Sequence, residues 1–478
     1  MTTSESTRLP ELFVRRICDQ LGASEGAALC AALDTLPPVA VRLHPQKLPL
    51  AEAGLEQAAA LLPALRCAGP IPWSPAGCVL AERPSFTLDS DFHAGAYYVQ
   101  EPASHFVGHL LQGVETAGCR LLDLCAAPGG KTTLYSSLVG PEGLVVANEI
   151  DRRRAAVLAD NVRKWGTGNV AVTVCEARQF GEQLEAFFDV VAVDAPCSGE
   201  GMFRKDAEVR TAWSESNVRL CARRQEEILR EAWRALRPGG TLIYSTCTFN
   251  REEDEGSLER LLAAVGDEVT AADPVAVDAA WGIVCGSVGP FQTFRFLPHR
   301  TLGEGFFAAV ARKSGSEEAR RPKTKANMRN RRSLLAAADR TAEREAARWV
   351  TDPGAMRFVQ VADTLYGWPA AQADALRMLS ECLPVICSGV AMGQLFKGRL
   401  KPDPALAFFV GLQRAALPVA ELAEAEALSY LRRQEVAAAC FAEGVNLVTA
   451  RGRALGFAKR IGARVNNGYP ASLRIVKQ

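Results

Sequence analysis

Residues 121–133 read LLDLCAAPGGKTT, and this stretch decides the fold. It begins as an apolar strand that ends at Asp123, passes through a turn of Ala, Pro and Gly, and enters a helix at about Lys131. Gly129 and Gly130 have no side chain to block an approaching ligand, and the first turn of a helix offers free N–H groups. The segment therefore predicts a strand–turn–helix unit that binds a carboxylate or a phosphate.

The phosphate loop of nucleotide hydrolases is the alternative for this segment, because GGKTT resembles the end of that loop. Its pattern, G-x-x-x-x-G-K-[ST], requires a glycine at position 125. Cys125 stands there instead. The residues therefore argue against a nucleotide hydrolase.

Short apolar runs alternate with amphipathic helices on both sides of this unit, from about residue 85 to 313. Such alternation predicts an α/β fold with a parallel sheet that is covered on both faces. Seven runs qualify as strands of one open sheet, and the last two, FQTFRFLP and GFFAAVARK, form a closing hairpin. The prediction is a Rossmann-like, seven-stranded domain with its ligands at the carboxyl ends of the strands.

Acidic residues end the next two predicted strands. Glu149 ends VVANEID, where the second strand of a βαβ unit carries the acid that binds a ribose diol. Glu176 ends the third strand and could accept a hydrogen bond from the amine of an adenine. The alternative for each is a surface carboxylate at a strand end. Combined with the glycine turn, the two acids indicate a nucleoside-binding site.

Two later strands end beside thiols. FDVVAVDAPCSG ends at Asp194 and continues into Cys197, and GTLIYSTCTF reaches Cys247. Adjacent parallel strands would place the two cysteines within one or two strand spacings of about 4.8 Å. Both would then face the nucleoside pocket, which favours a chemical role over core packing. A redox disulfide is the alternative for a close thiol pair.

The rest of the chain divides into four further units. We expect a mostly helical N-terminal region that contacts RNA (1–84), a basic linker (314–345), a small intermediate domain (346–410) and a β-rich C-terminal domain (411–478), around the sheet domain of 85–313. Within the first region, VAVRLHPQK reads as a basic loop with Arg42 and Lys47. These two side chains could touch a phosphate backbone, and a solvated loop is the alternative.

Bulk composition excludes several classes of protein. The net charge of +1 gives no sign of a nucleic-acid partner, so any such signal is local. No apolar run reaches the roughly 20 residues of a membrane span, and the N-terminus lacks the layout of a signal peptide. The 14 cysteines include no CxxC pair, which argues against a zinc site. We expect a cytoplasmic protein with mostly buried thiols, no bound metal and no obligate protein partner.

DLCAAPGGKTT, ANEID, DAPCSGEGMFRKD and YSTCTFNREEDEG resemble the successive motifs of the Sun-type RNA cytosine-5 methyltransferases. The closest resemblance is to the bacterial RsmF/YebU-like branch, which modifies 16S rRNA. FHAGAYYVQEPASHF and the C-terminal LGFAKRIGARVNNGYP are also similar to that branch. The resemblance covers nearly the whole chain beyond residue 10, with both cysteine motifs in the family's order.

The resemblance implies a class I methyltransferase fold, a C-terminal PUA-like RNA-binding domain, S-adenosyl-L-methionine as cofactor and methylation of carbon 5 of a cytosine. Its catalytic residues map onto Cys247 as nucleophile, Cys197 for release of the RNA, and Asp194 for a bond to the base. The cofactor pocket maps onto Cys125, Ala126, Ala127, Pro128, Gly129, Gly130, Lys131, Glu149, Glu176 and Asp194. Where the family pattern is Asp-Ala, this chain has Glu176-Ala177.

The predicted RNA contacts are basic or aromatic residues outside this pocket. Phe203, Arg204 and Lys205 follow the Cys197 turn and could hold the target strand. Lys459, Arg460 and Arg464 of the C-terminal domain would add phosphate contacts, and a solvated basic face is the alternative for them.

Two other functions share parts of this pattern. A DNA or protein methyltransferase would keep the fold and the cofactor, but DNA cytosine methyltransferases use the Pro-Cys cysteine as nucleophile. Cys247, which follows Ser245 and Thr246, therefore favours RNA. A non-enzymatic RNA-binding assembly factor would tolerate loss of a thiol or of the glycine turn, and this chain keeps all of them. Ribosomal RNA is favoured through the branch, and transfer RNA is the alternative substrate.

Overall fold

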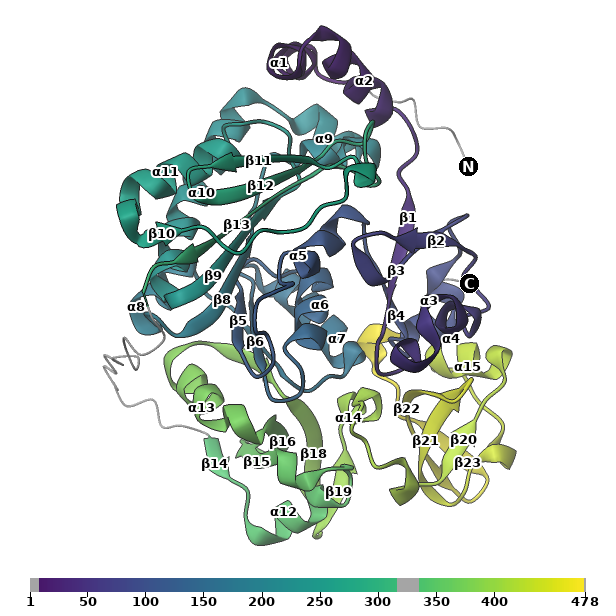
Figure 1. Ribbon diagram of the computed structural model, residues 1–478. Coiled ribbons are helices and arrows are strands. Elements are labelled where there is room, and N and C mark those ends of the chain that lie inside the picture. The colour runs from purple at the N-terminus through teal and green to yellow at the C-terminus, as the bar shows by residue number, and fades with distance from the viewer. Residues whose placement is uncertain (1–7, 316–334, 477–478) are drawn as a thin grey trace.

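The computed structural model describes residues 8–315 and 335–476, and its centre is one large sheet (Figure 1). Within the described residues this sheet has ten strands in the order β11-β12-β13-β9-β8-β5-β6-β7-β17, with β10 paired to β13. The first group of strands runs parallel: β5 (Arg120–Asp123), β6 (Leu144–Asn148), β7 (Val170–Thr173), β8 (Phe188–Asp194) and β9 (Leu236–Thr246). The others run antiparallel: β10 (Val269–Thr270), β11 (Val284–Val288), β12 (Phe291–Phe296), β13 (Phe306–Lys313) and β17 (Val385–Ser388).

The seven predicted strands are all present, and the predicted closing hairpin is β12–β13. Successive side chains of a strand point to opposite faces, so Leu121 and Leu122 enter two separate cores. Helices cover both faces, as the apolar runs predict. One face carries α5 (Phe106–His109), α6 (Gly130–Leu138) and α7 (Arg152–Trp165), and the other carries α8 (Ala177–Gln183), α10 (Glu215–Ala235) and α11 (Glu255–Val265).

The N-terminal region is less helical than predicted, because it also forms a four-stranded sheet in the order β2-β3-β1-β4. Its elements are α1 (Glu11–Leu21), α2 (Ala23–Leu33), β1 (Val39–Leu43), α3 (Leu50–Ala60), β2 (Cys67–Ile71), β3 (Ser74–Leu80), α4 (Ser90–His93) and β4 (Tyr97–Val99). A disulfide joins Cys67 to Cys78 across β2 and β3, so these two cysteines are not the free thiols that we expected.

The interpretation of VAVRLHPQK as a basic loop is wrong, because it contains the buried strand β1. Arg42 is only 1% exposed and donates to Gln100, Thr133 and the carbonyl of Gly130. The ammonium of Lys47 donates to two backbone carbonyls. Both cations are therefore hydrogen-bonded inside the protein and are not placed to touch a phosphate backbone.

The chain beyond the sheet domain forms two further units. Most of the predicted linker, residues 316–334, lies outside the described part of the chain. A five-stranded sheet follows, in the order β14-β15-β16-β18-β19, and β17 leaves it to extend the large sheet beside β7. Its elements are β14 (Leu335–Ala337), α12 (Arg340–Ala347), β15 (Met356–Val361), β16 (Thr364–Pro369), α13 (Ala373–Cys382), β18 (Val390–Phe396), β19 (Arg399–Pro402) and α14 (Pro404–Phe408).

The C-terminal unit is a small β domain, as predicted. It contains β20 (Val419–Glu421), α15 (Glu424–Leu431), β21 (Gly444–Ala450), β22 (Arg453–Ile461) and β23 (Arg464–Asn467). It lies beside the N-terminal sheet (Figure 1), where Arg451 and Arg453 pair with the fully buried Asp91. In the described part of the chain, no helix combines the length and apolarity needed to cross a membrane.

Candidate active site

The predicted site residues gather where the parallel strands of the large sheet end. β5 ends at Asp123 and β8 ends at Asp194, and these strands are direct neighbours in the sheet. β9 lies on the other side of β8, with Ser245 opposite Asp194. Parallel neighbours end at the same edge, so the residues that follow these strands face one region.

The turn after β5 is fixed by its backbone. The N–H of Leu124 donates to the carbonyl of Ala192, and the N–H of Ala126 donates to the carbonyl of Asn148. The carbonyls of Ala127 and Pro128 are also occupied, because Arg154 and Asn161 donate to them. The turn is thus fixed between β6 and β8 by hydrogen bonds within the protein.

Glycine is required at the start of α6. Gly129 has a φ of +109°, which side chains rarely tolerate, and a Cβ there would lie 3.0 Å from Leu158. At Gly130 a Cβ would lie 3.3 Å from the ring of Tyr98. The two glycines therefore bring bare backbone to the helix N-terminus, as the sequence predicts for a ligand-binding turn.

Asp123 is a site residue that we did not include among the cofactor contacts. It is 1% exposed, and burial raises the pKa of this carboxyl to about 7, although Thr132 donates to its Oδ2 at 2.6 Å. Its Oδ1 is buried without a hydrogen-bond partner in the described structure. An acidic residue that ends the first strand, directly before the glycine turn, is the signal in the sequence that identifies it.

The two acids predicted to bind the nucleoside differ in their surroundings. Glu149 is 4% exposed, accepts from the N–H of Asp151 and pairs with Arg154 at 3.4 Å. Glu176 precedes α8 and is exposed. Asn148, which the sequence reasoning missed, donates to the carbonyls of Leu124 and Cys175 and so ties the ends of β5, β6 and β7 together.

Lys131 points from α6 to the end of β8. Its Nζ lies 2.7 Å from Oδ2 of Asp194, and Ser245 donates to Oδ1 of Asp194 at 2.8 Å. Burial alone would lower the pKa of Lys131, but the charge of Asp194 and the hydrogen bond to it raise that pKa above its ordinary value. A fixed ammonium–carboxylate pair therefore stands beside the thiols, with a third of the Asp194 side chain open to a ligand.

The two predicted cysteines meet at this pair. The sulfur atoms of Cys197 and Cys247 lie 3.4 Å apart without a bond between them. The hydrogen bond to Cys247 and burial raise the pKa of Cys197 well above its ordinary value. The structure thus holds Cys197 as a neutral thiol that can donate a proton.

A buried polar network, missed by the sequence reasoning, fixes the two cysteine loops to each other. Glu200 follows Cys197 and accepts from Thr248, Trp213 and the N–H groups of Phe249 and Asn250. Glu253, in the other loop, accepts from the N–H of Ser198 and from Gln225 and Asn250. The motifs GEG and NREED are the features of the sequence that could have identified this network, because each places an acid in the loop that follows a cysteine.

The predicted RNA-contact residues are mostly engaged within the protein. Phe203 is 1% exposed and packs against Phe13, so it cannot stack on a base. Arg204 donates to Gly303, Thr35 and Leu36, and Lys205 pairs with Glu304. In the C-terminal unit, Arg460 donates to three backbone carbonyls, whereas Lys459 and Arg464 are exposed.

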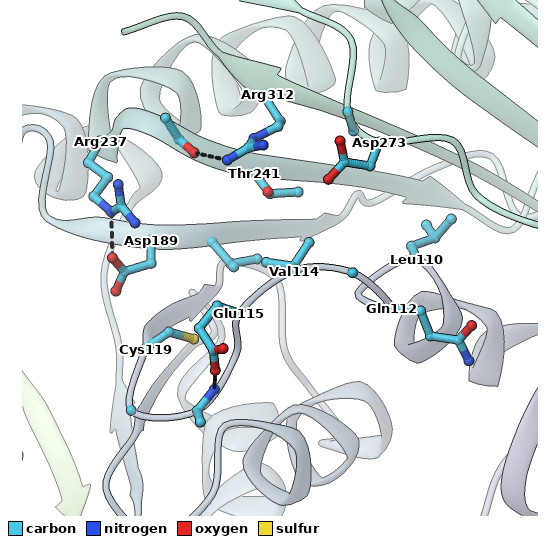
Figure 2. Close-up of a pocket in the computed structure, with 16 residues that line it drawn as sticks. Leu110, Gln112, Val114, Glu115, Cys119, Asp189, Arg237, Thr241, Asp273 and Arg312 are labelled. Carbon is cyan, nitrogen blue, oxygen red and sulfur yellow. Dashed lines mark hydrogen bonds and ion pairs between the residues drawn. The ribbon is translucent and has the colours of Figure 1, made fainter. Parts of the chain in front are cut away.

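Figure 2 shows a different cavity, of about 360 Å³, at the opposite edge of the sheet, where the parallel strands begin. Asp189 lies there and accepts from Arg237 at 2.5 Å and from the N–H of Arg120 at 2.6 Å. None of the predicted site residues lines it. Among the residues described, no cluster of three or more His, Cys, Asp or Glu side chains is placed to hold a metal.

Comparisons with known proteins agree with this arrangement. Family models match residues 9–102 (N-terminal domain of 16S rRNA methyltransferase RsmF), 111–312 (16S rRNA methyltransferase RsmB/F) and 418–475 (methyltransferase RsmF PUA domain). Ribosomal RNA small subunit methyltransferase F of Klebsiella pneumoniae (strain 342) is 32% identical over 428 residues, which cover 84% of each chain.

Two solved structures share the fold. A methyltransferase homolog protein from Pyrococcus horikoshii superposes with a TM-score of 0.52 at 24% identity, over 64% of this chain and 95% of its own. NSun6 from the same organism, solved with SFG, gives 0.54 at 19% identity, over 65% and 99%. These likenesses confirm the class I methyltransferase fold, and the family confirms S-adenosyl-L-methionine as the cofactor. The chain belongs to the RsmB/F family of 16S rRNA methyltransferases, in its RsmF branch.

Proposed function

We propose that this protein methylates carbon 5 of a cytosine in structured RNA, in small-subunit ribosomal RNA, through a covalent bond between Cys247 and the base. The observation that carries the proposal is the meeting of two free thiols, 3.4 Å apart, at an ammonium–carboxylate pair beside the glycine turn. Cytosine-5 chemistry needs each of these groups, as the following steps describe.

The turn Cys125–Lys131, with Glu149, Glu176 and Asp194, would hold S-adenosyl-L-methionine, which supplies an electrophilic methyl group. The unpartnered Oδ1 of Asp123 and the bare backbone at Gly129 fit a ligand that carries an amino group and a carboxylate. Glu149 fits a ribose diol at the end of β6, because its carboxylate is fixed by Asp151 and Arg154.

Cys247 would begin the reaction, because carbon 5 of cytosine is a poor nucleophile. The thiolate adds to carbon 6 and converts the ring into an enamine, whose carbon 5 then takes the methyl group. Lys131 is held at the end of β8, beside the strand that leads to Cys247, so its ammonium would attract the negative charge of the attacking sulfur. Asp194, held by Lys131 and Ser245, would bond the ring nitrogen or amine and stabilise the proton that the ring gains.

Cys197 would act after the methyl transfer. Carbon 5 must lose its proton to a base, which water can supply, and the bond between carbon 6 and the sulfur of Cys247 then breaks, so that the electron pair leaves on the sulfur and the methylated base is released. Cys197 touches that sulfur and remains a neutral thiol, so it is placed to protonate the departing thiolate. We therefore assign release of the RNA to Cys197.

The target cytosine must leave its stack to reach Cys247. Lys459 and Arg464 expose their side chains on the C-terminal unit and would contact the phosphate backbone elsewhere on the RNA. The side chains of Arg204 and Lys205 are bonded within the protein and that of Phe203 is buried, so these three residues are not proposed as RNA contacts.

Bisulfite sequencing of total RNA from cells with and without the gene tests the reaction. We expect one cytosine of small-subunit ribosomal RNA to lose its protection. Loss of protection in transfer RNA would keep the chemistry and refute the substrate. If no cytosine in any RNA changes, the proposed reaction is wrong.

Variants of the two thiols test the mechanism. Cys247→Ala should abolish methyl transfer without forming an adduct, whereas Cys197→Ala should accumulate a denaturation-resistant protein–RNA complex on gels. Cys285→Ala is a matched control, because this cysteine is free and exposed outside the site. If Cys197→Ala gave no complex and Cys247→Ala did, the two roles would be reversed.

A further inference from the structure

The hairpin formed by β18 and β19 exposes an aromatic side chain among cations. Phe396 ends β18 and is 66% exposed, among the most exposed large apolar side chains of the described residues. Residues 394–402 contain Lys397, Arg399 and Lys401 and no acidic residue. This surface lies in the unit that follows the large sheet (Figure 1), because β18 and β19 belong to the separate five-stranded sheet.

The register of the hairpin places these side chains on one face. Phe396 pairs with Arg399, and Gln394 pairs with Lys401, whereas Leu395 pairs with Leu400. Because side chains alternate along a strand and paired residues share a face, Gln394, Phe396, Arg399 and Lys401 lie together. All four are exposed, and Leu400 on the other face is buried in the core of this unit.

Formation of the hairpin does not require an exposed aromatic ring at position 396. The alternation of the hairpin puts Leu400 inward and polar residues outward, so a polar residue is expected at position 396. Lys397 lies over the Phe396 ring at 5.5 Å, but no apolar neighbour covers the ring. Among the residues described, no ion pair involves Lys397, Arg399 or Lys401. Two acids lie near the hairpin: Asp363, in the turn between β15 and β16, and Glu345 of α12, which accepts from the N–H of Leu400 at 3.2 Å.

The tip of the hairpin is short and defined. Lys397 and Gly398 form a two-residue turn, with φ values of +51° and +75°. A lysine is disfavoured at a positive φ, so its presence adds a cation at a strained position. A tight turn of this kind holds Phe396 and Arg399 in a fixed relation to each other.

We propose that the solvent face of the β18–β19 hairpin is a second RNA-binding surface, which stacks an unpaired base on Phe396 and contacts phosphates through Lys397, Arg399 and Lys401. An exposed aromatic ring accepts the face of any base, and flanking cations follow the backbone of the strand. A membrane surface is the other partner that cations attract, but a bilayer-inserting face needs several large apolar side chains. Among the described residues of the hairpin, Phe396 is the large apolar side chain on this face, and the neighbouring Leu395, 36% exposed, lies on the other face.

The proposal rests on the proposed RNA substrate, but its test is independent of methyl transfer. Binding of the full chain to 16S rRNA transcripts and to assembled small ribosomal subunits is measured by filter retention at several salt concentrations. Phe396→Ala should weaken binding by about fivefold or more, since stacking on an aromatic side chain contributes that much per base. Phe396→Tyr should bind like the wild type, because the ring is retained.

Matched controls separate this effect from general loss of surface. Leu220→Ala removes an apolar side chain that is 46% exposed on α10, and it should leave RNA affinity unchanged. The double variant Arg399→Gln/Lys401→Gln should lower the slope of log affinity against log salt by about 1.4, at roughly 0.7 per lost phosphate contact. Arg223→Gln/Arg224→Gln on α10 removes the same charge and should preserve the slope.

Three outcomes would overturn the proposal. Wild-type affinity of Phe396→Ala for both RNAs would show that the ring does not stack. An unchanged salt slope in the Arg399→Gln/Lys401→Gln protein would show that the cations do not meet phosphates. If Phe396→Ala lost binding to anionic phosphatidylglycerol vesicles and kept its RNA affinity, the hairpin would be assigned to a membrane. If the bisulfite experiment shows no change in any cytosine, the proposed reaction is wrong, but the binding measurements still test whether the hairpin binds RNA.

Discussion

Replacement of Glu200 by Gln tests whether the buried network holds the two cysteine loops together. The two carboxylate oxygens share five donors. Oε2 accepts from the hydroxyl of Thr248 at 2.7 Å and from the N–H groups of Phe249 and Asn250 at 2.8 and 3.1 Å. Oε1 accepts from the indole of Trp213 at 3.0 Å and from the side chain of Asn250 at 3.1 Å.

The cost of the substitution follows from this count. A glutamine can keep its oxygen at the Oε2 position and retain three bonds, but its NH₂ group then faces the donors of Trp213 and Asn250. Trp213 then loses its partner in a site that is 1% exposed, whereas the side chain of Asn250 still donates to Oε1 of Glu253 at 2.8 Å. A buried donor left unsatisfied costs about 1–3 kcal/mol, so Glu200→Gln should destabilise the protein by about 1–3 kcal/mol. The opposite orientation would lose three bonds and costs more.

Two measurements check this magnitude. For a domain of this size, a loss of 2 kcal/mol lowers the midpoint of thermal unfolding by about 4 °C or more, which circular dichroism resolves. The rate of methyl transfer should fall by about 100-fold, because Phe249 and Asn250 follow Cys247 directly and a displacement of about 1 Å at a reacting group has that effect. Glu208→Gln is the matched control, since Glu208 is exposed on α9 (Ala207–Ala212). A Glu200→Gln protein that unfolds within 1 °C of the wild type and methylates at its rate would refute the reasoning.

Three further substitutions probe other parts of the molecule. Burial raises the pKa of Asp123 to about 7 from 3.8, so the folded state retains a proton that the unfolded chain has lost, and stability falls as pH rises between about 4 and 7. Asp123→Asn should remove up to about 1.4 kcal/mol per pH unit of that slope, and parallel slopes in urea unfolding at pH 5, 6 and 7 would contradict this. Gly129→Ala should strain the turn and weaken sinefungin binding, measured by calorimetry, by tenfold or more; unchanged affinity would show that the positive φ does not matter. Arg453→Ala leaves the buried Asp91 with one cation fewer and should cost about 3 kcal/mol, detected as faster proteolytic release of the C-terminal unit; a wild-type digestion rate would argue against docking by this pair.

The sheet and its functional edge could be predicted because their signals are local. Each parallel strand is an apolar run that ends at a turn, and Asp194 and Cys197 are three positions apart in the sequence. Once the strands are parallel, their carboxyl ends must share one edge. The meeting of Cys197 and Cys247 therefore follows from two local patterns and one rule of topology. The contacts assigned to Glu149 and Glu176 remain predictions.

Residues whose partners are remote in sequence were beyond prediction. Arg42 looks like a loop cation, but its acceptors are Gln100, directly after β4, and Gly130 and Thr133 of α6, all of them 58 or more positions away in the sequence. Strand β17 is likewise a short run whose partner, β7, lies more than 200 positions earlier. Local pattern identifies a strand or a charge, but it does not identify which distant group neutralises the charge or completes the sheet.

Helix α6 connects the parts of the site that the sequence presents separately. Lys131 reaches Asp194 in the base-binding region, and Thr132 donates to Asp123 under the cofactor turn. Thr133, one position later, accepts from Arg42 of the N-terminal sheet at 2.6 Å. Burial lowers the pKa of Arg42 to about 9, so the guanidinium remains charged at neutral pH and holds the carbonyl of Gly130 as well. Three consecutive residues thus join the N-terminal sheet, Asp123 before the glycine turn, and Asp194 at the end of β8.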